Sequence, residues 1–480
     1  MASIRVELFI NNQDVPGRSY LVVKDPGRLS DRVGELAQAD GSQVDEAVRA
    51  AHRAFHTWRD TPLPQRVALL QAAAALLDAQ ASTVAELMAL ESGMLIATCR
   101  QEVHTAAHIV RDNAGMAIDF LTPQVIEDDT SWVGIEKRPM GVVAGIVSWN
   151  APVVLTMRKL APALACGNTI VIKPSPSAAL GLSLLLRRFA ALFPSGVINV
   201  VHGDADVGTA LTTHPLVRKV SFTGGGKVAS AIMRNAAETM KNVQFELGGN
   251  DPAIVLDDAD PDEVMPRIAQ AAFRRAGQFC FAIKRVYLPA SRYDLFFDRL
   301  RAEVDRLQVG HPLDKRANMG PMNNRAQWQF VKDLVQRTRD AGTEVLELGE
   351  VLDAEDWSQG YYLRPMLVRH PEPNADIVLV EQFGPVLPVV AYRHESEAIR
   401  MANQTELGLG SSVWSRDRER ALAVARQLES GMGFINQAAA SRLGQRHMPF
   451  GGVKQSGIGR ESSEVGMAEY VEYQAINYSK

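Results

Sequence analysis

The stretch GVVAGIVSWNAPVVLTMRKLAPALACGNTIVIKP, residues 141–174, consists of two continuous apolar runs on either side of a longer segment with helical texture. Residues 141–148 and 168–174 are rich in β-branched side chains and have the length of buried strands, whereas 153–165 is long enough for a helix. Strands that are apolar on both faces occur mainly in parallel sheets. The stretch therefore predicts a βαβ unit.

The same alternation continues towards the C-terminus. We expect further elements in this order: a helix at 180–192, strands at 197–201 and 217–223, a strand at 252–258, a helix through Ala276, a strand at 283–289 and a helix at 291–307. This order predicts an α/β fold with a doubly wound parallel sheet and a second α/β domain that starts after Gly249. Ligands of such sheets bind beyond the carboxyl ends of the strands.

The sequence upstream of residue 141 is mainly helical in pattern. Apolar residues in 62–93 recur at steps of three and four, which indicates helix. Thr83 and Glu86 have the spacing of a capping box, which predicts that a second helix opens there and ends at Gly93. Residues 124–140 are more polar and predict an excursion such as a hairpin arm.

The composition is that of an ordinary globular protein. With 46% hydrophobic and 22% charged residues among 480, the chain can bury enough apolar surface to fold. A formal net charge of −4 without long single-sign runs argues against nucleic-acid and membrane-surface partners. No apolar run approaches the ~20 residues that cross a bilayer, and no signal peptide is evident, so we expect a cytoplasmic protein with small-molecule partners.

Three cysteines are too few for a disulfide framework and show no metal-ligand spacing, so no metal site is expected. Cys280 follows a helical stretch and precedes a strand, where a turn can present a thiol to backbone amides that favour the thiolate. The alternative is a buried cysteine that acts as a small hydrophobic residue. We adopt that alternative for Cys99 and Cys166.

Three other positions have side chains or backbone suited to chemistry. FTGGGKVA at 222–229 is a glycine-rich turn between strand and helix, which can face a phosphate or be a plain loop. Glu246 ends a strand beside two glycines and is either a general base or a solvated charge. Asn150 lies at a strand-to-helix switch and is either an oxyanion donor or a helix cap.

Seven motifs taken together resemble the aldehyde dehydrogenase superfamily in their order. They are SWNAP (148–152), PALACGNTIVIKPSP (162–176), FTGG (222–225), ELGGN (246–250), GQFC (277–280), EQFGP (381–385) and PFGGVKQSGIGRE (449–461). The resemblance extends from about residue 8 to residue 477. The 34-residue interval between Glu246 and Cys280 also fits the family.

The resemblance implies oxidation of an aldehyde to a free carboxylic acid. Cys280 would attack the aldehyde to give a thiohemiacetal, whose oxyanion is held by the Asn150 amide and the Cys280 backbone N–H. Hydride then passes to nicotinamide, and Glu246 activates water to hydrolyse the thioester. The implied cofactor contacts are Lys173, Ser175, Gly224, Gly225, Trp149, Leu247, Glu381 and Phe383. Pro176 stands where many NAD-specific members carry glutamate, so NAD and NADP both remain open.

Two arginines indicate an anionic substrate. Many members of the family carry large aromatic residues at the positions of Arg158 and Arg274. At both positions this sequence instead resembles succinate-semialdehyde dehydrogenases, which carry arginines there. If Arg158 lies two helical turns beyond Asn150, the rise is ~12 Å and leaves space for a short semialdehyde. Bidentate guanidinium contacts suit carboxylates. The entrance loop would add positive charge from Arg442, Arg446 and His447.

Two alternatives stay open. Arginines on amphipathic helices are usually solvated, and Phe279 and Phe281 beside Cys280 favour neutral aromatic or aliphatic aldehydes. From another class, the chain could be a catalytically silent cofactor-binding or structural homologue, because fold does not fix function. The joint presence of Cys280, Glu246 and Asn150 argues against silence.

The resemblance also implies three structural units. We expect a dinucleotide-binding domain (1–123 and 141–247), a catalytic domain (248–450) and a small β bridging element (124–140 and 470–480). An isolated β arm leaves strand edges unpaired, which predicts a homodimer or homotetramer.

Overall fold

The computed structural model describes residues 4–480, and its largest sheet is an eight-stranded one with the order β24-β12-β11-β8-β9-β10-β2-β3. The central strands are mutually parallel: β8 (Val142–Ile146), β9 (Thr169–Lys173), β10 (Ile198–Val200), β11 (Val217–Thr223) and β12 (Asn242–Glu246). Antiparallel strands complete it: β2 (Leu8–Ile10), β3 (Gln13–Val15) and β24 (Gly457–Ile458). The predicted doubly wound parallel sheet is confirmed.

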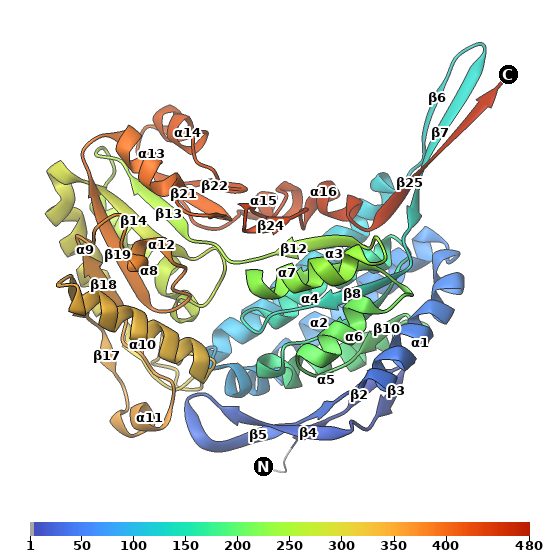
Figure 1. Cartoon of the computed structure of the whole chain (residues 1–480), viewed down its shortest axis with the longest axis horizontal. Helices are drawn as coiled ribbons and strands as arrows, with labels where there is room; N and C mark the ends of the chain where they lie inside the picture. Colours follow the sequence, from blue (N-terminus) through green and yellow to red (C-terminus); the bar gives the residue numbers. More distant parts are fainter. Residues whose placement is uncertain (1–3) are drawn as a thin grey trace.

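Helices cover both faces of this sheet, because its central strands are apolar on both sides (Figure 1). Val143, Ile170 and Ile172 pack against one group of helices: α2 (Leu63–Ser92), α3 (Ile96–Phe120), α4 (Pro152–Ala165) and α5 (Leu180–Ala190). Val142 and Val171 point the other way, towards α1 (Gly41–Arg59), α6 (Ala205–Thr213) and α7 (Gly226–Ala237). The period-two alternation of a strand thus supplies two cores.

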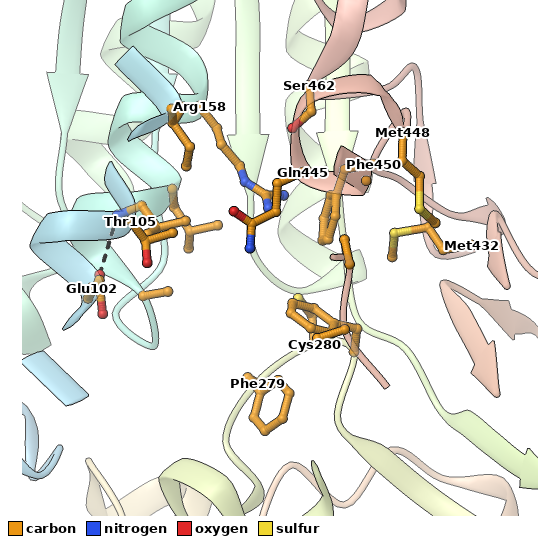
Figure 2. A pocket seen from close by; sticks show the side chains of 18 of the residues that line it. Glu102, Thr105, Arg158, Phe279, Cys280, Met432, Gln445, Met448, Phe450 and Ser462 are labelled. Carbon is orange, nitrogen blue, oxygen red and sulfur yellow. Dashed lines mark hydrogen bonds between the residues drawn. The ribbon is translucent and has the colours of Figure 1, made fainter. Parts of the chain in front are cut away.

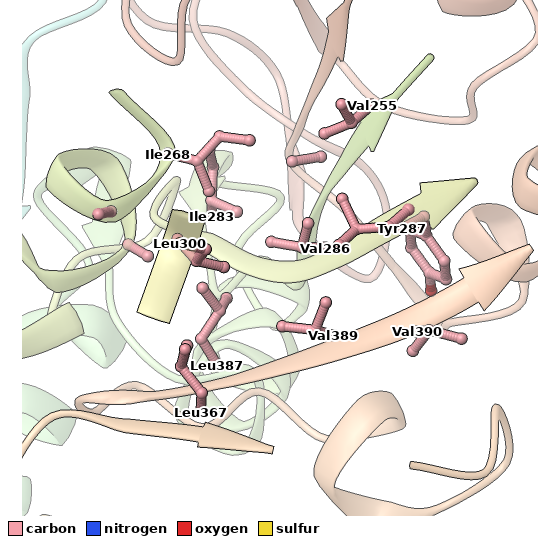
Figure 3. Close-up of a cluster of buried hydrophobic side chains, with 14 of the residues drawn as sticks. Val255, Ile268, Ile283, Val286, Tyr287, Leu300, Leu367, Leu387, Val389 and Val390 are labelled. Carbon is pink, nitrogen blue, oxygen red and sulfur yellow. The ribbon is translucent and has the colours of Figure 1, made fainter. Parts of the chain in front are cut away.

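A second α/β body follows residue 250, with a seven-stranded sheet in the order β16-β18-β19-β14-β13-β21-β22. Its strands are β13 (Asp251–Val255), β14 (Ile283–Pro289), β16 (Glu344–Glu347), β18 (Met366–Arg369), β19 (Val386–Tyr392), β21 (Gly410–Trp414) and β22 (Met432–Ile435). Its main helices are α8 (Pro261–Phe273), α9 (Tyr293–Asp305), α10 (Arg325–Asp340), α13 (Glu395–Asn403) and α14 (Arg418–Ala425). Figure 3 shows part of its core, a buried cluster that includes Val286 and Val389 of neighbouring strands and Leu300 of α9.

A three-stranded arm projects from the body (Figure 1). It contains β6 (Gln124–Glu127), β7 (Ser131–Pro139) and the C-terminal strand β25 (Val471–Ser479). β25 runs antiparallel to β7 over its whole length, from the Val471–Pro139 pair to the Ser479–Ser131 pair. Two segments distant in the sequence therefore form one element.

The remaining elements include a three-stranded sheet in the order β1-β5-β4 and several short strands and helices. They are β1 (Ile4–Val6), β4 (Ser19–Asp25), β5 (Arg28–Gln38), β15 (Gln308–Val309), β17 (Glu350–Val351), α11 (Ala354–Gln359), α12 (Asp376–Leu379), β20 (Leu407–Gly408), α15 (Arg442–His447), β23 (Val453–Lys454) and α16 (Ser463–Ala468), with 3₁₀ turns at Pro176–Ala178, Arg274–Gly277 and Ala290–Arg292.

The helix break expected at Thr83 is wrong, because α2 is a single helix of 30 residues. Its buried stripe runs through Ala81, Val84 and Met88 without interruption, so the helical packing continues where the capping-box spacing suggested a start. Gly93 does end the helix, with a left-handed φ of 78°.

We expect no apolar run long enough to cross a bilayer, but α2 departs from this expectation. An 18-residue window of this helix has a mean hydropathy of 1.3, so by length and composition it is the one helix within residues 4–480 able to cross a membrane. In the structure its residues Leu70 and Leu77 are fully buried, in a core shared with α3, α4 and α5. A third of that window is buried, so packing against the neighbouring helices accounts for part of its apolar character.

The core of the second body should depend on Leu300. We expect Leu300→Ala to lower the free energy of unfolding by about 2–5 kcal/mol, because the fully buried side chain leaves a cavity. Leu295→Ala, on the same helix but 54% exposed, is the matched control and should change it by less than about 0.5 kcal/mol. Urea denaturation followed by circular dichroism measures both, and equal losses would contradict the assignment.

Candidate functional site

One pocket brings together residues from both α/β bodies. Its lining comes from α3, α4, the segment 274–281, β22 and α15. Figure 2 shows Glu102 and Thr105 on one side of the pocket, Met432, Met448 and Phe450 on the opposite side, and Cys280 between them. The expected site residues Asn150, Arg158, Arg274, Phe279, Cys280 and Phe281 all line this pocket.

Cys280 is half-buried and lies just beyond the 3₁₀ turn Arg274–Gly277. Burial raises the pKa of its thiol to about 12, and the positive charge of Lys284 opposes this increase. The expectation that the turn by itself favours the thiolate is therefore not met, because desolvation outweighs the nearby positive charge. Cys99 and Cys166 are buried in the core, as expected.

Lys284 is a buried cation that the sequence reasoning missed. Its Nζ donates to the carbonyl oxygen of Phe279 at 3.0 Å and to that of Cys280. It also lies 3.3 Å from Oε1 of Glu381, which accepts a second hydrogen bond from the Gly249 N–H at 3.1 Å. Lys284 thus links the segment that carries Cys280 to Glu381. The available signal was a lysine inside the predicted apolar strand 283–289.

Asn150 lies in the loop between β8 and α4 and is buried. The N-cap residue of α4 is Ala151, and the Asn150 side chain does not cap the helix. Glu102 of α3 performs that task, since its Oε1 accepts from the N–H groups of Val153 (2.8 Å) and Val154 (3.3 Å). The helix-cap interpretation of Asn150 is therefore wrong, and its side chain lines the pocket.

Glu246 is buried at the end of β12, outside the lining of the pocket. Neither of its carboxylate oxygens has a hydrogen-bond partner within residues 4–480. Burial, and then the negative charge of Glu461, raise the pKa of Glu246 well above its usual range, whereas Lys159 and Arg158 oppose the increase. A desolvated carboxylate of this kind is a stronger base than a solvated one.

Arg158 and Arg274 differ in the charged groups that lie beside them. The Arg158 guanidinium lies 3.8 Å from Oε2 of Glu461 and 4.0 Å above the ring centroid of Phe450. Oε1 of Glu461 in turn accepts from Lys159 at 2.6 Å. Arg274 is exposed at the pocket and has neither an ion pair nor a hydrogen bond with the described residues. Arg274 is thus the arginine whose charge is available to a ligand.

An apolar wall faces the arginines. Phe279 and Phe281 meet edge to face at 5.2 Å, and Phe281 meets Phe450 in the same way at 5.6 Å. Met432 and Met448 extend this wall. Sequence reasoning found the two phenylalanines beside Cys280 but not the other three residues, because those come from segments more than 150 positions away.

The entrance helix α15 contributes less charge than expected. Both guanidinium NH groups of Arg442 bond to Asp112, at 2.8 and 3.0 Å, which neutralises this residue. Arg446 and His447 do not line the pocket, whereas Gly444 and Gln445 of the same helix do. The prediction that this helix adds positive charge at the entrance is therefore wrong. The helix contributes the backbone of Gly444 and the side-chain amide of Gln445 to the pocket instead.

Most of the expected cofactor residues lie at the carboxyl ends of the parallel strands of the first sheet, whereas Glu381 and Phe383 come from the second body. Lys173 ends β9 beside Ile146 of β8, and burial lowers the pKa of its amine while Asp204 and Asp206 oppose this. Ser175 follows in the next loop, Trp149 meets Phe383 edge to face at 5.6 Å, and the Leu247 N–H donates to the Ser456 carbonyl.

The glycine turn before α7 has room for a ligand. Gly225 is the N-cap residue of α7, and the helix has no side-chain cap. A Cβ built on Gly225 or Gly226 would meet nothing within 4 Å, whereas one on Gly224 would collide with the Phe222 ring at 2.3 Å. Open glycines before an uncapped helix N-terminus fit a phosphate group.

A protein family and its members match almost the whole chain, including the segments that form the site. A model of the Aldehyde dehydrogenase family matches residues 15–476. The 3-sulfolactaldehyde dehydrogenase of Pseudomonas putida is 35% identical over 453 residues, covering 93% of this chain and 91% of that protein.

Solved structures agree equally well. An NADP dependent enzyme of E. coli gives a TM-score of 0.94 at 31% identity, covering 99% of this chain and 98% of that one. Betaine aldehyde dehydrogenase of Staphylococcus aureus, in complex with NAD+, gives 0.94 at 29% identity, covering 98% and 94%.

A family match over almost the whole chain leaves the catalytically silent alternative without support. The expected oxidoreductase activity and the expected choice between NAD and NADP are those of the family and of the solved neighbours. The chain therefore belongs to the aldehyde dehydrogenase family of NAD- or NADP-dependent oxidoreductases.

Proposed function

We propose that this enzyme oxidises a small anionic aldehyde, such as the semialdehyde of a carboxylic acid, to the free acid. The observation that carries the proposal is that Cys280, Asn150 and the unpaired Arg274 line one pocket. The first two supply a nucleophile and an amide donor, and the third supplies a charge for the far end of the substrate.

The protein's own residues divide the chemistry as follows. The Cys280 thiol loses its proton to solvent, its sulfur bonds to the aldehyde carbon, and the carbonyl oxygen becomes an oxyanion that accepts hydrogen bonds from the Asn150 amide and the Cys280 N–H. A bound nicotinamide would supply the hydride acceptor through which the Cys280 adduct becomes a thioester. Glu246 then takes a proton from water, the water oxygen attacks the thioester, and the carbon–sulfur bond breaks to release the acid.

The cofactor would lie across the carboxyl edge of the eight-stranded sheet. Gly225 and the uncapped start of α7 are suited to the pyrophosphate, Lys173 to the adenosine ribose and Glu381 to the nicotinamide ribose. Pro176 places no negative charge near a 2′-phosphate. NAD and NADP are both compatible with these residues.

The charge of Arg274 supports the anionic substrate. Because Arg158 shares its charge with Glu461, Arg274 is the main anchor in the proposal and Arg158 contributes less. A relative at 35% identity is a 3-sulfolactaldehyde dehydrogenase, whose name denotes an aldehyde that carries a sulfonate. The apolar wall of Phe279, Phe281 and Phe450 favours the second candidate, a neutral aromatic or aliphatic aldehyde.

We also propose a homodimer or homotetramer that acts in the cytoplasm. The arm carries exposed apolar side chains on both outer strands: Val125 (53% exposed), Ile126 (56%), Tyr473 (58%), Ile476 (39%) and Tyr478 (60%). Exposed apolar strands favour association with another subunit, because water solvates them poorly.

Removal of the guanidinium at position 274 tests the substrate. We expect Arg274→Ala to lower kcat/KM for succinate semialdehyde ~10- to 150-fold, because a charged hydrogen bond of ~1.5–3 kcal/mol is lost. Arg158→Ala is the matched comparison and should cost less. Butanal, a neutral aldehyde of similar length, should lose little in either variant. Equal losses on both aldehydes, or a wild-type preference for benzaldehyde, would favour the second candidate.

The raised pKa of Cys280 predicts the pH dependence of its reactivity without cofactor. Because the thiol pKa is about 12, the thiolate fraction grows as pH rises and does not saturate near neutrality. Iodoacetamide inactivation should accelerate about tenfold per pH unit between pH 7 and 9. Cys280→Ser should abolish turnover and the fast alkylation, which separates Cys280 from Cys99 and Cys166. A plateau below pH 8 would contradict the structure.

Charge placed on the arm tests the proposed assembly. We expect Ile126→Glu combined with Ile476→Glu to shift the mass measured by light scattering from the oligomer towards the monomer, because both side chains are exposed in the single chain. Leu295→Glu, exposed on α9, is the control and should leave the mass unchanged. A wild-type monomer at micromolar concentration, or an unchanged mass in the double variant, would contradict the proposal.

A further inference from the structure

Arg275, next to the free Arg274, also lines the pocket, but its guanidinium is paired with groups of the protein. One NH group donates to the backbone carbonyl of Asn150, and the other donates to Oε2 of Glu102 at 2.7 Å. The Arg275 side chain is 10% exposed and that of Glu102 is fully buried. This ion pair therefore crosses between the two α/β bodies in a place that water hardly reaches.

The backbone around Arg275 is strained. Arg275 and Ala276 have φ of 54° each, and Gly277 follows with 72°, so three successive residues are in the left-handed region. That region is unfavourable for residues with a Cβ, and such turns persist only when surrounding contacts fix them. The turn ends three residues before Cys280. Its conformation therefore determines the position of the segment that carries the Cys280 thiol.

Glu102 connects the same contact to α4. Its second oxygen caps the first amides of α4, while Arg275 holds the carbonyl of the residue whose side chain faces the pocket. The two donors proposed for the oxyanion, the Asn150 amide and the Cys280 N–H, belong to different α/β bodies. The Arg275–Glu102 contact lies between their two segments.

We propose that Arg275, with Glu102, is a positioning residue that fixes the Asn150 amide relative to Cys280. The inference rests on the proposed role of Asn150 in the reaction. It assigns opposite tasks to adjacent arginines: Arg275 is neutralised internally and sets geometry, whereas Arg274 remains free for an anionic substrate.

The test compares Arg275→Gln with Arg274→Gln in the holoenzyme. Arg275→Gln should lower kcat about 10- to 100-fold for succinate semialdehyde and butanal alike, with KM changed less than about threefold, because misplaced donors weaken the transition state for every aldehyde. Arg274→Gln should instead raise KM for the anionic aldehyde. Arg301→Gln, an exposed arginine of α9, controls for loss of charge.

Two more variants keep the test decisive if Arg275→Gln folds poorly. Arg275→Lys keeps the charge but cannot span both acceptors, so kcat should recover only in part. Glu102→Gln keeps the α4 cap but weakens the ion pair, so it should lower kcat in the same direction and add little to Arg275→Gln in the double variant.

Two outcomes would overturn the inference. They are an unchanged kcat in Arg275→Gln, with or without a fall in melting temperature, and a loss confined to the KM of the anionic aldehyde. Asn150→Ala separates the two proposals. If it leaves kcat unchanged, the proposed function fails; if it lowers kcat while Arg275→Gln does not, only the role of Arg275 fails.

Discussion

The parallel arrangement of the central strands is the constraint on which the site depends. Right-handed crossovers return every strand in the same direction, so the carboxyl ends of β8, β9, β11 and β12 share one edge. Asn150, Lys173, Gly224 and Glu246 follow or end those strands, and the chain then enters the second body. The segment with Cys280 immediately precedes β14 and faces that edge across the pocket.

Desolvation determines the electrostatics at this edge. Burial raises the pKa of Cys280 and Glu246, although Lys284 acts against it at the first and Lys159 at the second. A protein core holds buried ionisable groups at a cost in stability, and a buried carboxylate with a raised pKa is a candidate general base. The carboxylate oxygens of Glu246 have no hydrogen-bond partner among the described residues, which lowers stability and leaves the group available as a base.

The sequence predicts most of the fold because its signals are local. Continuous apolar strands at 141–148 and 168–174 lead directly to the parallel sheet, and the motif residues fall at its edge. The break predicted at Thr83 failed for the converse reason: a local capping pattern cannot reveal that Ala81, Val84 and Met88 continue one buried stripe. The helix-cap interpretation of Asn150 failed likewise, since the cap comes from Glu102 on another helix.

The arginines show where local reasoning stops. Arg158, Arg274 and Arg275 all line the pocket, and the sequence gives each the same charge. Glu102, 173 positions before Arg275, forms an ion pair with it, and Glu461, 303 positions after Arg158, lies 3.8 Å from Arg158 but also pairs with Lys159, so only tertiary structure identifies the arginine without an ion pair among the described residues. Because a buried ion pair left with one partner is strongly destabilising, these glutamates restrict which arginine can change. Under the proposed function, Arg274 is therefore the arginine whose replacement would change the preference between anionic and neutral aldehydes with least disturbance to the rest of the site.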